Sequence, residues 1–558
     1  MRIAMAQVNS TVGDLGGNVE KIRRFIADAK SYQADLVAFP ELVITGYPPQ
    51  DLLLERSFVE RNKKSLEELI NDNNADIAGV IGFVDYDDSG SLHNAAALFE
   101  GNRLAGITYK TLLPTYDVFD EDRYFKPSTE DEIRPVCAEI NGRKVRVGVE
   151  ICEDLWDQEY DTKVTDMLAK KGAELIVNIS ASPFYAGKRL EREKQLIEKA
   201  VRNGVPIFYV NLVGGQDELV FDGQSLAVDA SGSLIAYAKQ FEEDLVITEI
   251  DLQTGVGEKA NPPGYDKEEE MFNALVLGVR DYFRKTGFSK AVVGMSGGID
   301  SSLTTCIAVE ALSKENVIGV YMPSRFSSEH SRTDARNLAD NLGICFVQFS
   351  IQDIIGSYGR TLEAPLEHIR KEFGIERGAD DPVADENIQP RARGNCLMDI
   401  SNRLRDLRIL VWNTGNKTEL ALGYCTLYGD MTGGLGALGD VSKLEVYKLA
   451  EYVNRKAGKE VIPRNVFRKR PSPELTEGQV DPFDFSIVSP MVDEIVENRT
   501  SKVELIGMGY PKSIVEDIYR RVRNAEYKRR QAPPCIKITP KAFGIGWKMP
   551  LVNKYSGL

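Results

Sequence analysis

The chain is poor in histidine. Only three of its 558 residues are histidine, and His93 is the only one in the first half of the sequence. Enzymes that use a serine or cysteine nucleophile usually activate it with an imidazole. The shortage of histidine therefore disfavours that kind of catalysis over most of the chain.

Cysteine is also scarce, and its seven positions are scattered. No CxxC pair occurs, and the count is odd, so neither a zinc ribbon nor a disulfide framework is indicated. No apolar run approaches the length that spans a bilayer, and the first residues do not resemble a signal peptide. We therefore expect a cytoplasmic protein.

Basic residues are fewer than acidic ones. The sequence has 69 Lys and Arg against 84 Asp and Glu, which gives a net charge of -15. Nucleic-acid binding requires Lys and Arg to neutralise phosphates, so this balance disfavours a nucleic-acid partner. A small anionic substrate is still compatible, because a local site can be positive on an acidic protein.

What the sequence does contain is a regular alternation of strand and helix patterns. Hydrophobic residues make up 42% of the chain, as in globular proteins with full-sized cores. Up to about residue 254, β-branched runs such as IAGVIGFV and AELIVNIS alternate with helical spacing, which indicates a layered α/β domain. A Gly- and Pro-rich stretch at 255–266 predicts a linker. From 267 to 558, strand–helix–strand units predict a doubly wound parallel sheet, interrupted by a polar insertion at 363–386.

One candidate nucleophile is Cys152, in the segment GVEICEDLW at the end of a predicted strand. A lone cysteine there is usually an inert core residue, and a Cys–His pair would depend on His93 alone. A thiol without histidine needs a carboxylate base and a cation for the oxyanion. Glu41 and Lys110, each following a predicted strand, provide these two groups.

Three segments in register resemble the nitrilase superfamily: FPEL at Glu41, YKTLLPTYDVFDEDRYF at Lys110 and ICEDLWD at Cys152. The resemblance implies an αββα sandwich in which Glu41 is the general base, Lys110 stabilises the tetrahedral intermediate and Cys152 attacks an amide. It also places Glu121 near the cysteine. The later segment NISASPFYAGKRLERE is similar to glutaminase members, which implies glutamine contacts by Tyr116, Ser182 and Lys188. The alternative for these three is an ordinary polar loop.

A second candidate site is the segment VVGMSGGIDSSL, between a predicted strand and a predicted helix. Glycines there let the backbone approach an anion, and helix N–H groups bind phosphate. No Gly-Lys-Ser/Thr follows the glycines, so this is not a Walker A loop. It resembles the PP-loop of ATP pyrophosphatases, which adenylate a substrate. The implied ATP-binding residues are Gly294, Met295, Ser296, Gly297, Gly298, Ile299, Asp300, Ser301, Thr414 and Lys443.

The combination of these two halves resembles the family of glutamine-dependent NAD synthetases over essentially the whole chain. Similar enzymes that make GMP use a Cys–His–Glu triad, which here would depend on His93 alone, and those that make asparagine use an N-terminal cysteine, which Arg at position 2 excludes. The segments ENIQPRARGNCLM, TGNKTE and EYKRRQAPP match the family. They imply deamido-NAD contacts by Asn387, Arg391, Glu419 and Lys528, and magnesium binding by Asp300 and Glu419. For single basic residues, a solvated surface charge is an equal alternative.

The implied reaction is ATP-dependent amidation of deamido-NAD in NAD biosynthesis, with ammonia taken from glutamine. ATP and Mg²⁺ are the implied substrate and ion, and the family suggests a homo-oligomer, an octamer, with an enclosed ammonia passage. Two other functions remain open: a carbon–nitrogen hydrolase with a degenerate nucleotide module, and a binding protein that senses glutamine and ATP. The intact SGGIDS and TGNKTE segments argue against the first, and pyrophosphate release would test it. The complete set of Glu41, Lys110 and Cys152 argues against the second, and a glutaminase rate near zero would favour it.

Overall fold

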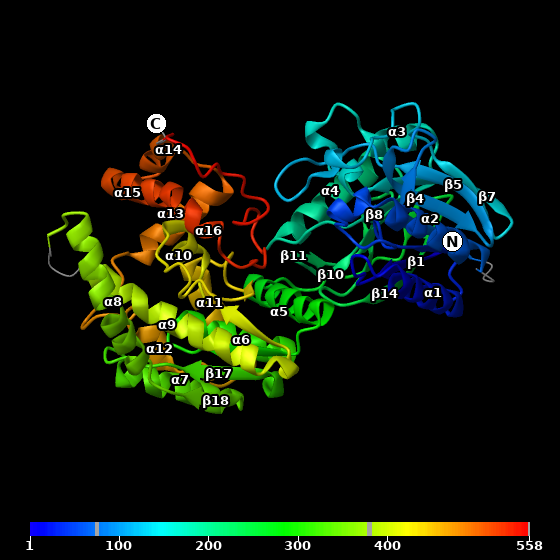
Figure 1. Ribbon diagram of the computed structural model, residues 1–558. Helices are drawn as coiled ribbons and strands as arrows, with labels where there is room; N and C mark the ends of the chain where they lie inside the picture. Colours follow the sequence, from blue (N-terminus) through cyan, green and yellow to red (C-terminus); the bar gives the residue numbers. More distant parts are fainter. Residues whose placement is uncertain (73–76, 377–381, 556–558) are drawn as a thin grey trace. The chain divides into compact units, whose positions relative to one another are not determined.

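The computed structural model describes residues 1–72, 77–376 and 382–555, which form two compact units, Met1–Asp266 and Lys267–Leu558 (Figure 1). We treat each unit separately. Within the described residues, no helix is both long and apolar enough to cross a membrane.

The first unit contains two large sheets. The seven-stranded sheet has the order β15-β14-β1-β2-β3-β4-β5. Its strands are β1 (Arg2–Gln7), β2 (Leu36–Ala38), β3 (Ala78–Tyr86), β4 (Leu92–Glu100), β5 (Arg103–Tyr109), β14 (Asp244–Asp251) and β15 (Val256–Gly257). The short strand β15 lies in the stretch that we expected to be a linker, and it pairs with β14.

The second sheet has six strands in the order β13-β12-β9-β8-β7-β6. Its strands are β6 (Val136–Ile140), β7 (Arg143–Ile151), β8 (Leu175–Ser180), β9 (Ile207–Asn211), β12 (Leu226–Val228) and β13 (Leu234–Tyr237). A separate hairpin joins β10 (Val213–Gln216) and β11 (Leu219–Asp222).

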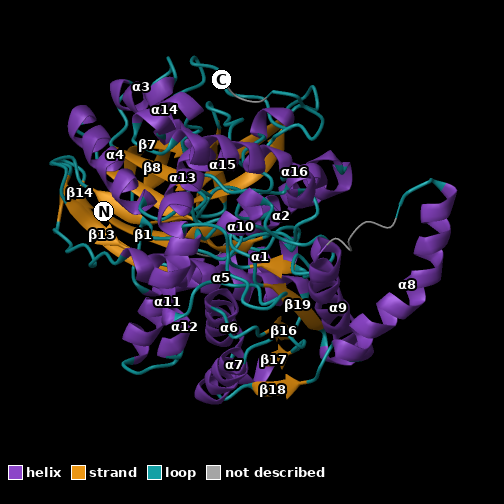
Figure 2. Ribbon diagram, turned by 90° about the vertical axis from the view of Figure 1, so that its left-hand side faces the viewer, coloured by secondary structure: helices purple, strands orange, loops and turns teal. Residues whose placement is uncertain are grey.

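Successive residues of each strand point to opposite faces of its sheet, so each sheet packs against the other sheet on one face and against helices on the other. The two sheets are therefore the middle layers of a four-layer sandwich. One core lies between the sheets and contains residues of both, such as Met5 and Val80 against Val149 and Val177. Neighbouring strand residues face outward, where α1 (Leu15–Ser31) and α2 (Arg56–Asn71) cover the first sheet. The second sheet is covered by α3 (Val164–Lys170) and α4 (Lys188–Asn203). The predicted αββα arrangement is confirmed (Figure 2).

The second unit is built on a five-stranded sheet with all pairings parallel, in the order β18-β17-β16-β19-β20. The strands are β16 (Lys290–Gly294), β17 (Val317–Tyr321), β18 (Cys345–Gln348), β19 (Ile409–Asn413) and β20 (Leu435–Gly436). The order reverses between β16 and β19, and ligands of such sheets bind at this switch point, beyond the carboxyl ends of the strands.

Helices complete this unit. α6 (Ile299–Leu312) contacts β16 and β17, and α5 (Lys267–Thr286) and α11 (Lys443–Ala457) pack on α6. α9 (Pro382–Arg403) contacts β16 and β19. The remaining helices are α7 (Glu329–Leu342), α8 (Gln352–Glu372), α10 (Lys417–Leu422), α12 (Arg464–Arg468), α13 (Phe485–Glu497), α14 (Lys502–Gly507), α15 (Lys512–Asn524) and α16 (Glu526–Arg529). The described part of the expected polar insertion forms the end of α8 and the start of α9.

Candidate active sites

In the first unit, the ammonium group of Lys110 is enclosed by two carboxylates. Its Nζ donates to Oε1 of Glu41 at 2.7 Å and to both oxygens of Glu121, at 2.9 and 2.8 Å. The Lys110 and Glu41 side chains have no exposed surface, and that of Glu121 is 6% exposed. Burial by itself lowers the pKa of Lys110, but Glu121 and Glu41 outweigh it and hold the pKa well above its ordinary value. Lys110 is therefore a fixed positive charge.

Further donors also hydrogen-bond to the two carboxylates. The Asn94 amide donates to Glu41 at 2.7 Å and to Glu121 at 3.4 Å, the Tyr47 hydroxyl to Glu121 at 2.8 Å, and the Ala181 backbone N–H to Oε2 of Glu41 at 2.8 Å. A buried charge cluster is stable only when its polar groups are paired in this way. The position of Glu41 is thus set by three separate strand ends.

Cys152 is the first residue of a 3-10 turn, Cys152–Leu155, that begins where β7 ends. Its φ of +46° lies in the left-handed region, which is uncommon and costly for a residue with a side chain. The thiol is buried, and burial and the Glu41 charge raise its pKa well above the ordinary value, whereas Lys110 lowers it. The three predicted catalytic residues and Glu121 therefore act on one another electrostatically in a single buried site.

The carboxylate of Asp154 fixes the turn that carries Cys152. Its Oδ2 accepts the Ile151 N–H at 3.0 Å, and its Oδ1 accepts the N–H groups of Thr111 at 3.0 Å and Leu112 at 2.9 Å. Burial raises the pKa of Asp154 to about 7, against the effect of these hydrogen bonds. One buried side chain thus connects the Cys152 turn to the residues directly after Lys110.

The three residues expected to bind glutamine lie near this centre. Tyr116, half-exposed, donates its hydroxyl to Glu153 at 3.0 Å. Ser182 is buried directly after Ala181, and its backbone N–H donates to Asn211. The Lys188 ammonium donates to the Pro183 carbonyl at 2.9 Å, and it lowers the pKa of Glu153, which burial raises. Tyr116 and Lys188 therefore share Glu153 as a neighbour.

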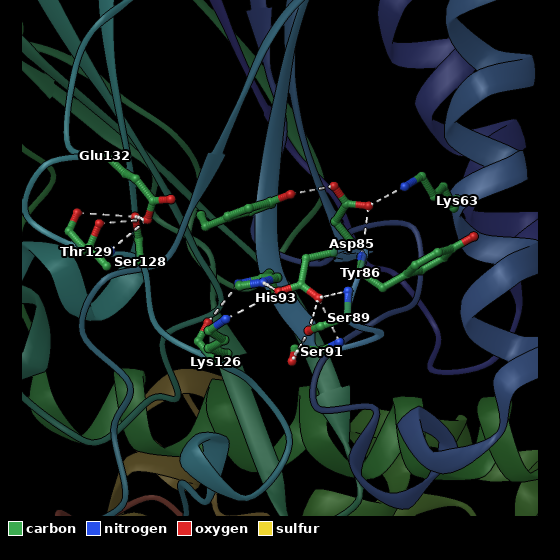
Figure 3. Close-up of polar contacts among 12 residues, drawn as sticks. Lys63, Asp85, Tyr86, Ser89, Ser91, His93, Lys126, Ser128, Thr129 and Glu132 are labelled. Carbon is green, nitrogen blue, oxygen red and sulfur yellow. Dashed lines mark hydrogen bonds and ion pairs between the residues drawn. The ribbon is translucent and has the colours of Figure 1, made fainter.

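His93 does not contact the cysteine. Its ring is stacked on Tyr109, and its nitrogens face the Lys126 carbonyl (Figure 3) and the Asp87 carboxylate. Asn94, the next residue on β4, contacts the catalytic carboxylates instead, because successive strand residues point to opposite faces. The geometry thus favours the histidine-free alternative.

In the second unit, the residues of the predicted phosphate loop follow β16 and lead into α6. Gly297 has φ +76°, and a Cβ atom there would lie 2.2 Å from the Ser331 carbonyl oxygen, so only glycine fits. The Ser296 hydroxyl accepts the Gly298 N–H at 3.2 Å and lies 3.1 Å from the Ser301 hydroxyl. The loop therefore presents backbone and hydroxyl groups at the N-terminus of a helix, where anions bind.

Lys443 connects two acidic residues from different elements. Its Nζ donates to Asp300 at 2.5 Å and to Glu419 at 3.2 Å, and Asn416 donates to the other Asp300 oxygen at 2.9 Å. Burial, with the Asp300 charge adding to it, raises the pKa of Glu419 to about 7. Thr414 lies in the loop after β19, the strand beside β16, so the ATP residues expected from sequence meet at one edge of the sheet.

Three of the four residues expected to bind deamido-NAD contact one segment, 423–430. The Lys528 ammonium donates to the carbonyls of Gly423 and Cys425 at 2.7 and 2.6 Å. Arg391 donates to the Leu427 carbonyl at 3.2 Å, and Asn387 accepts from the Thr426 hydroxyl at 2.8 Å. Glu419 is instead paired with Lys443. The Glu419 side chain therefore lies beside the phosphate loop, apart from the contacts that the other three residues make with the segment 423–430.

Several polar residues of these sites were missed by the sequence analysis. In the first unit they are Tyr47, Asn94, Glu153 and Asp154, and in the second unit it is Asn416. Glu153 and Asp154 directly follow Cys152 in the sequence. Two acidic residues beside a cysteine at the end of a buried strand were the available signal. Tyr47 and Asn94 have no motif of their own, because the tertiary fold alone brings them to Glu121 and Glu41: Tyr47 from the loop after β2 and Asn94 from strand β4.

Comparisons with known proteins match each unit to a different family. The carbon-nitrogen hydrolase family matches residues 2–257, and the NAD synthase family matches residues 271–532. The chain thus joins a carbon–nitrogen hydrolase unit to an NAD synthase unit.

Proteins with both units match along their whole length. The glutamine-dependent NAD(+) synthetase of Synechocystis is 44% identical over 99% of both chains, and that of Thermotoga maritima is 39% identical over 100% of this chain and 99% of its own. A structure of the Acinetobacter baumannii synthetase with ADP has a TM-score of 0.77 at 36% identity, covering 99% of this chain and 98% of that one. The chain belongs to the family of glutamine-dependent NAD(+) synthetases.

Proposed function

We propose that the protein makes NAD from deamido-NAD, ATP and glutamine, releasing glutamate, AMP and pyrophosphate. The observation that carries this proposal is the buried Lys110 between Glu41 and Glu121 beside Cys152, in a chain whose other unit has a lysine-free phosphate loop at its sheet switch point. The first site releases ammonia from an amide, and the second activates a carboxylate to receive it.

In the first reaction, the resting thiol is protonated because burial and neighbouring carboxylates raise its pKa. Glu41 takes this proton as the Cys152 sulfur attacks the amide carbon of glutamine. Lys110 stabilises the oxyanion that forms. Glu41 then returns the proton to the departing nitrogen, so ammonia and a γ-glutamyl thioester result. Water, deprotonated by Glu41, hydrolyses the thioester to glutamate and restores the thiol.

Recognition of glutamine requires partners for its α-amino and α-carboxylate groups. We assign the carboxylate to Lys188, whose ammonium lies above the Trp156 ring, 5.6 Å from its centroid. We assign the amino group to Glu153, which accepts hydrogen bonds from Tyr116 and Tyr160 at 3.0 and 3.1 Å. An amide that lacks these two charges would form neither of these ion pairs, which gives discrimination in favour of glutamine.

In the second reaction, the nicotinate carboxylate of deamido-NAD attacks the α-phosphorus of ATP, and pyrophosphate leaves. The loop 294–301 binds the phosphates through backbone N–H groups and the Ser296 and Ser301 hydroxyls. Lys443 neutralises their charge, and Thr414 contacts the nucleotide. Ammonia attacks the acyl-adenylate, and AMP leaves with the former carboxylate oxygen. Asn387, Arg391 and Lys528 hold the dinucleotide.

Asp300 and Glu419 fit a magnesium site. Both carboxylates lie within hydrogen-bond distance of the same Lys443 ammonium, so a cation already sits between them. Mg²⁺ is commonly held by one or two carboxylates together with substrate phosphates. When bound, the ion would neutralise charge on the phosphates, and Asp300 and Glu419 would hold it.

The test supplies deamido-NAD, ATP, magnesium and glutamine, and measures NAD and AMP. A Cys152→Ala variant is expected to lose glutamine-driven synthesis and to keep synthesis with an ammonium salt. Cys137→Ala, which removes an exposed cysteine, is the matched control. If Cys152→Ala lost both activities while remaining folded, the assignment of separate sites would be wrong.

We also propose a homo-oligomer in the cytoplasm. The support for assembly is α8, on which no residue is buried. Leu362, Leu366 and Ile369 on this helix and Phe373 directly after it are between 43% and 75% exposed. These residues recur at helical spacing on one side, and contiguous apolar surface of this kind marks protein contacts. The support for the compartment is the cysteines, none of which forms a disulfide, as is usual in reducing surroundings.

A further inference from the structure

The phosphate loop has no lysine in its own sequence, but a lysine from a distant segment donates to its backbone. Lys469 directly follows α12 and stands 172 positions after Gly297. Its Nζ lies 2.5 Å from the Gly297 carbonyl oxygen and donates to it. The ATP contacts proposed above do not include this lysine.

The peptide group between Gly297 and Gly298 is held at both edges. Its C=O and its N–H lie in one plane and point in opposite directions. The C=O accepts from Lys469, and the N–H donates to the Ser296 hydroxyl at 3.2 Å. That hydroxyl lies 3.1 Å from the hydroxyl of Ser301. Lys469 therefore keeps the carbonyl turned away from the side on which the Gly298 N–H and the two hydroxyls lie.

This orientation matters because converging N–H groups bind an anion, whereas a carbonyl oxygen turned toward a phosphate repels it. Two consecutive glycines restrict the peptide between them very little, since neither has a Cβ. The start of α7 limits where the loop can lie, because a Cβ on Gly297 would meet the Ser331 carbonyl oxygen. The hydrogen bonds at its edges then decide which way the peptide faces.

Lys469 is itself held against the first turn of α7. Its Nζ lies 3.2 Å from the Ser331 hydroxyl and 3.6 Å from the Asp334 carboxylate. The Ser331 hydroxyl donates to Glu474 at 2.7 Å, and Glu474 also accepts from the N–H and the hydroxyl of Ser328, the N-cap of α7. The segment that carries Lys469 is thus attached to the same helical turn against which the phosphate loop packs.

The ammonium group of Lys469 is already surrounded by protein oxygens. Its side chain is 26% exposed, and burial lowers its pKa, against the effect of Asp334 and Glu474. An ammonium has three N–H groups, and oxygens of Gly297, Ser331 and Asp334 lie within 3.6 Å of this one. This environment suits a residue that holds the loop better than one that binds the nucleotide.

We propose that Lys469 is a positioning residue for ATP binding. It orients the peptide between Gly297 and Gly298 so that the N–H and the serine hydroxyls face the phosphates, and it places a positive charge behind the loop. Loss of this lysine should weaken ATP binding more than it slows the chemical step, because the loop must then become ordered at each binding event. This inference rests on the synthetase function proposed for the second unit.

The test measures KM for ATP and kcat of NAD synthesis with an ammonium salt as the nitrogen source. Lys469→Met removes the charge and the donors from a side chain of similar length. We expect KM for ATP to rise about tenfold, as for the loss of one charge-assisted hydrogen bond, with kcat changed less than about twofold. Lys469→Arg keeps the charge and donors and should stay within about threefold of the wild-type KM. Glutamine hydrolysis and the thermal unfolding midpoint report whether each variant is folded.

A double-mutant cycle with Gly297→Ala separates positioning of the loop from direct contact with ATP. Once the added methyl group has displaced the loop, Lys469→Met should raise KM for ATP by less than about twofold more. The matched control is Lys459→Met, which removes an exposed lysine from the same region and should leave KM for ATP unchanged.

A wild-type KM for ATP in folded Lys469→Met would overturn the inference. Additive effects in the double variant would also overturn it, because they would indicate that the lysine contacts ATP directly. If Lys469→Met does not fold, Lys469→Gln, which also lacks the charge, takes its place in the same assay, and a wild-type KM there has the same meaning. A wild type that makes no NAD from ammonium would instead reject the proposed function, so the two failures are distinguishable.

Discussion

The Asp154 carboxylate accepts the Leu112 backbone N–H at 2.9 Å, a bond between residues 42 positions apart. Through it, the turn that holds the nucleophile is attached to the strand end that holds Lys110. The nucleophile and its cation are therefore positioned by one shared side chain as well as by the two sheets that carry them.

Asp154→Asn tests this connection. An amide accepts with one oxygen and donates with its nitrogen, so at least one of the three N–H groups at this site would lose its acceptor. We expect unfolding free energy to fall by about 1–3 kcal/mol and glutamine hydrolysis to fall at least about tenfold. Denaturant titration and glutaminase assays measure these changes. The control is Asp28→Asn, on the exposed side of α1, which should change neither the free energy of unfolding nor the rate of glutamine hydrolysis. If Asp154→Asn hydrolysed glutamine as fast as wild type, the role assigned to Asp154 would be contradicted.

Glu41→Gln separates two roles of Glu41: its charge raises the pKa of the Cys152 thiol, and its carboxylate accepts the thiol proton during the reaction. The carboxylate charge raises the pKa of Cys152, so its removal should lower that pKa and shift iodoacetamide alkylation of Cys152 to lower pH. Hydrolysis should nevertheless fall by roughly a thousandfold, because the base is lost. Alkylation of the Cys152→Ala variant measures the background reaction of the other six cysteines. An alkylation profile that shifts to higher pH would contradict the electrostatic arrangement.

The sequence permitted prediction of both folds and of the groups that share a motif. The alternation of strand and helix in each half is a local property of the chain, so a layered α/β domain and a parallel sheet followed from it. The αββα sandwich was implied by the resemblance to the nitrilase superfamily. Glu41, Lys110 and Cys152 follow β2, β5 and β7, which are not neighbours and belong to two different sheets. Their proximity was therefore implied by the three family motifs, and strand pattern alone would not have given it.

Other features could not be predicted because they depend on pairing between distant segments. Asn94 reaches Glu41 only because β4 lies between β3 and β5, and no sequence signal gives that register. The insertion at 363–386 looked like an irregular polar stretch, since its apolar residues are few. In the structure its described part continues α8, where Leu366 and Ile369 form an exposed stripe.

Lys443→Met is expected to abolish synthesis with either nitrogen source. Without the ammonium, Asp300 and Glu419 repel each other and the phosphates, which should lower kcat about a hundredfold or more. Glutamine hydrolysis should remain, since its residues lie in the other unit. Lys448→Met, on the exposed side of the same helix, is the control. Ammonium-driven synthesis at the wild-type rate in Lys443→Met would rule out a role for this lysine in ATP chemistry.

Leu366→Lys tests the role of α8 in assembly. A charge in the centre of the apolar stripe would have to be desolvated at any contact, so we expect a smaller particle in sedimentation velocity. Glu367→Lys adds the same residue one position away, at a side chain that is 66% exposed and outside the stripe, and should leave the particle unchanged. An unchanged sedimentation coefficient for Leu366→Lys would show that assembly does not use this helix.

Gly297→Ala tests the phosphate loop with a single methyl group. Gly297 has φ +76°, and the new Cβ would meet the Ser331 carbonyl oxygen at 2.2 Å, so the loop must move away from the start of α7. The strain costs about 1–3 kcal/mol, and the displaced N–H groups no longer converge on the phosphates. We expect ATP affinity, measured by calorimetry, to fall at least about tenfold while glutamine hydrolysis persists. Gly507→Ala, where a Cβ meets nothing within 4 Å, is the control. Unchanged ATP affinity in Gly297→Ala would mean that the nucleotide binds elsewhere in this unit, because no arrangement that uses the loop tolerates the added methyl group in its present conformation.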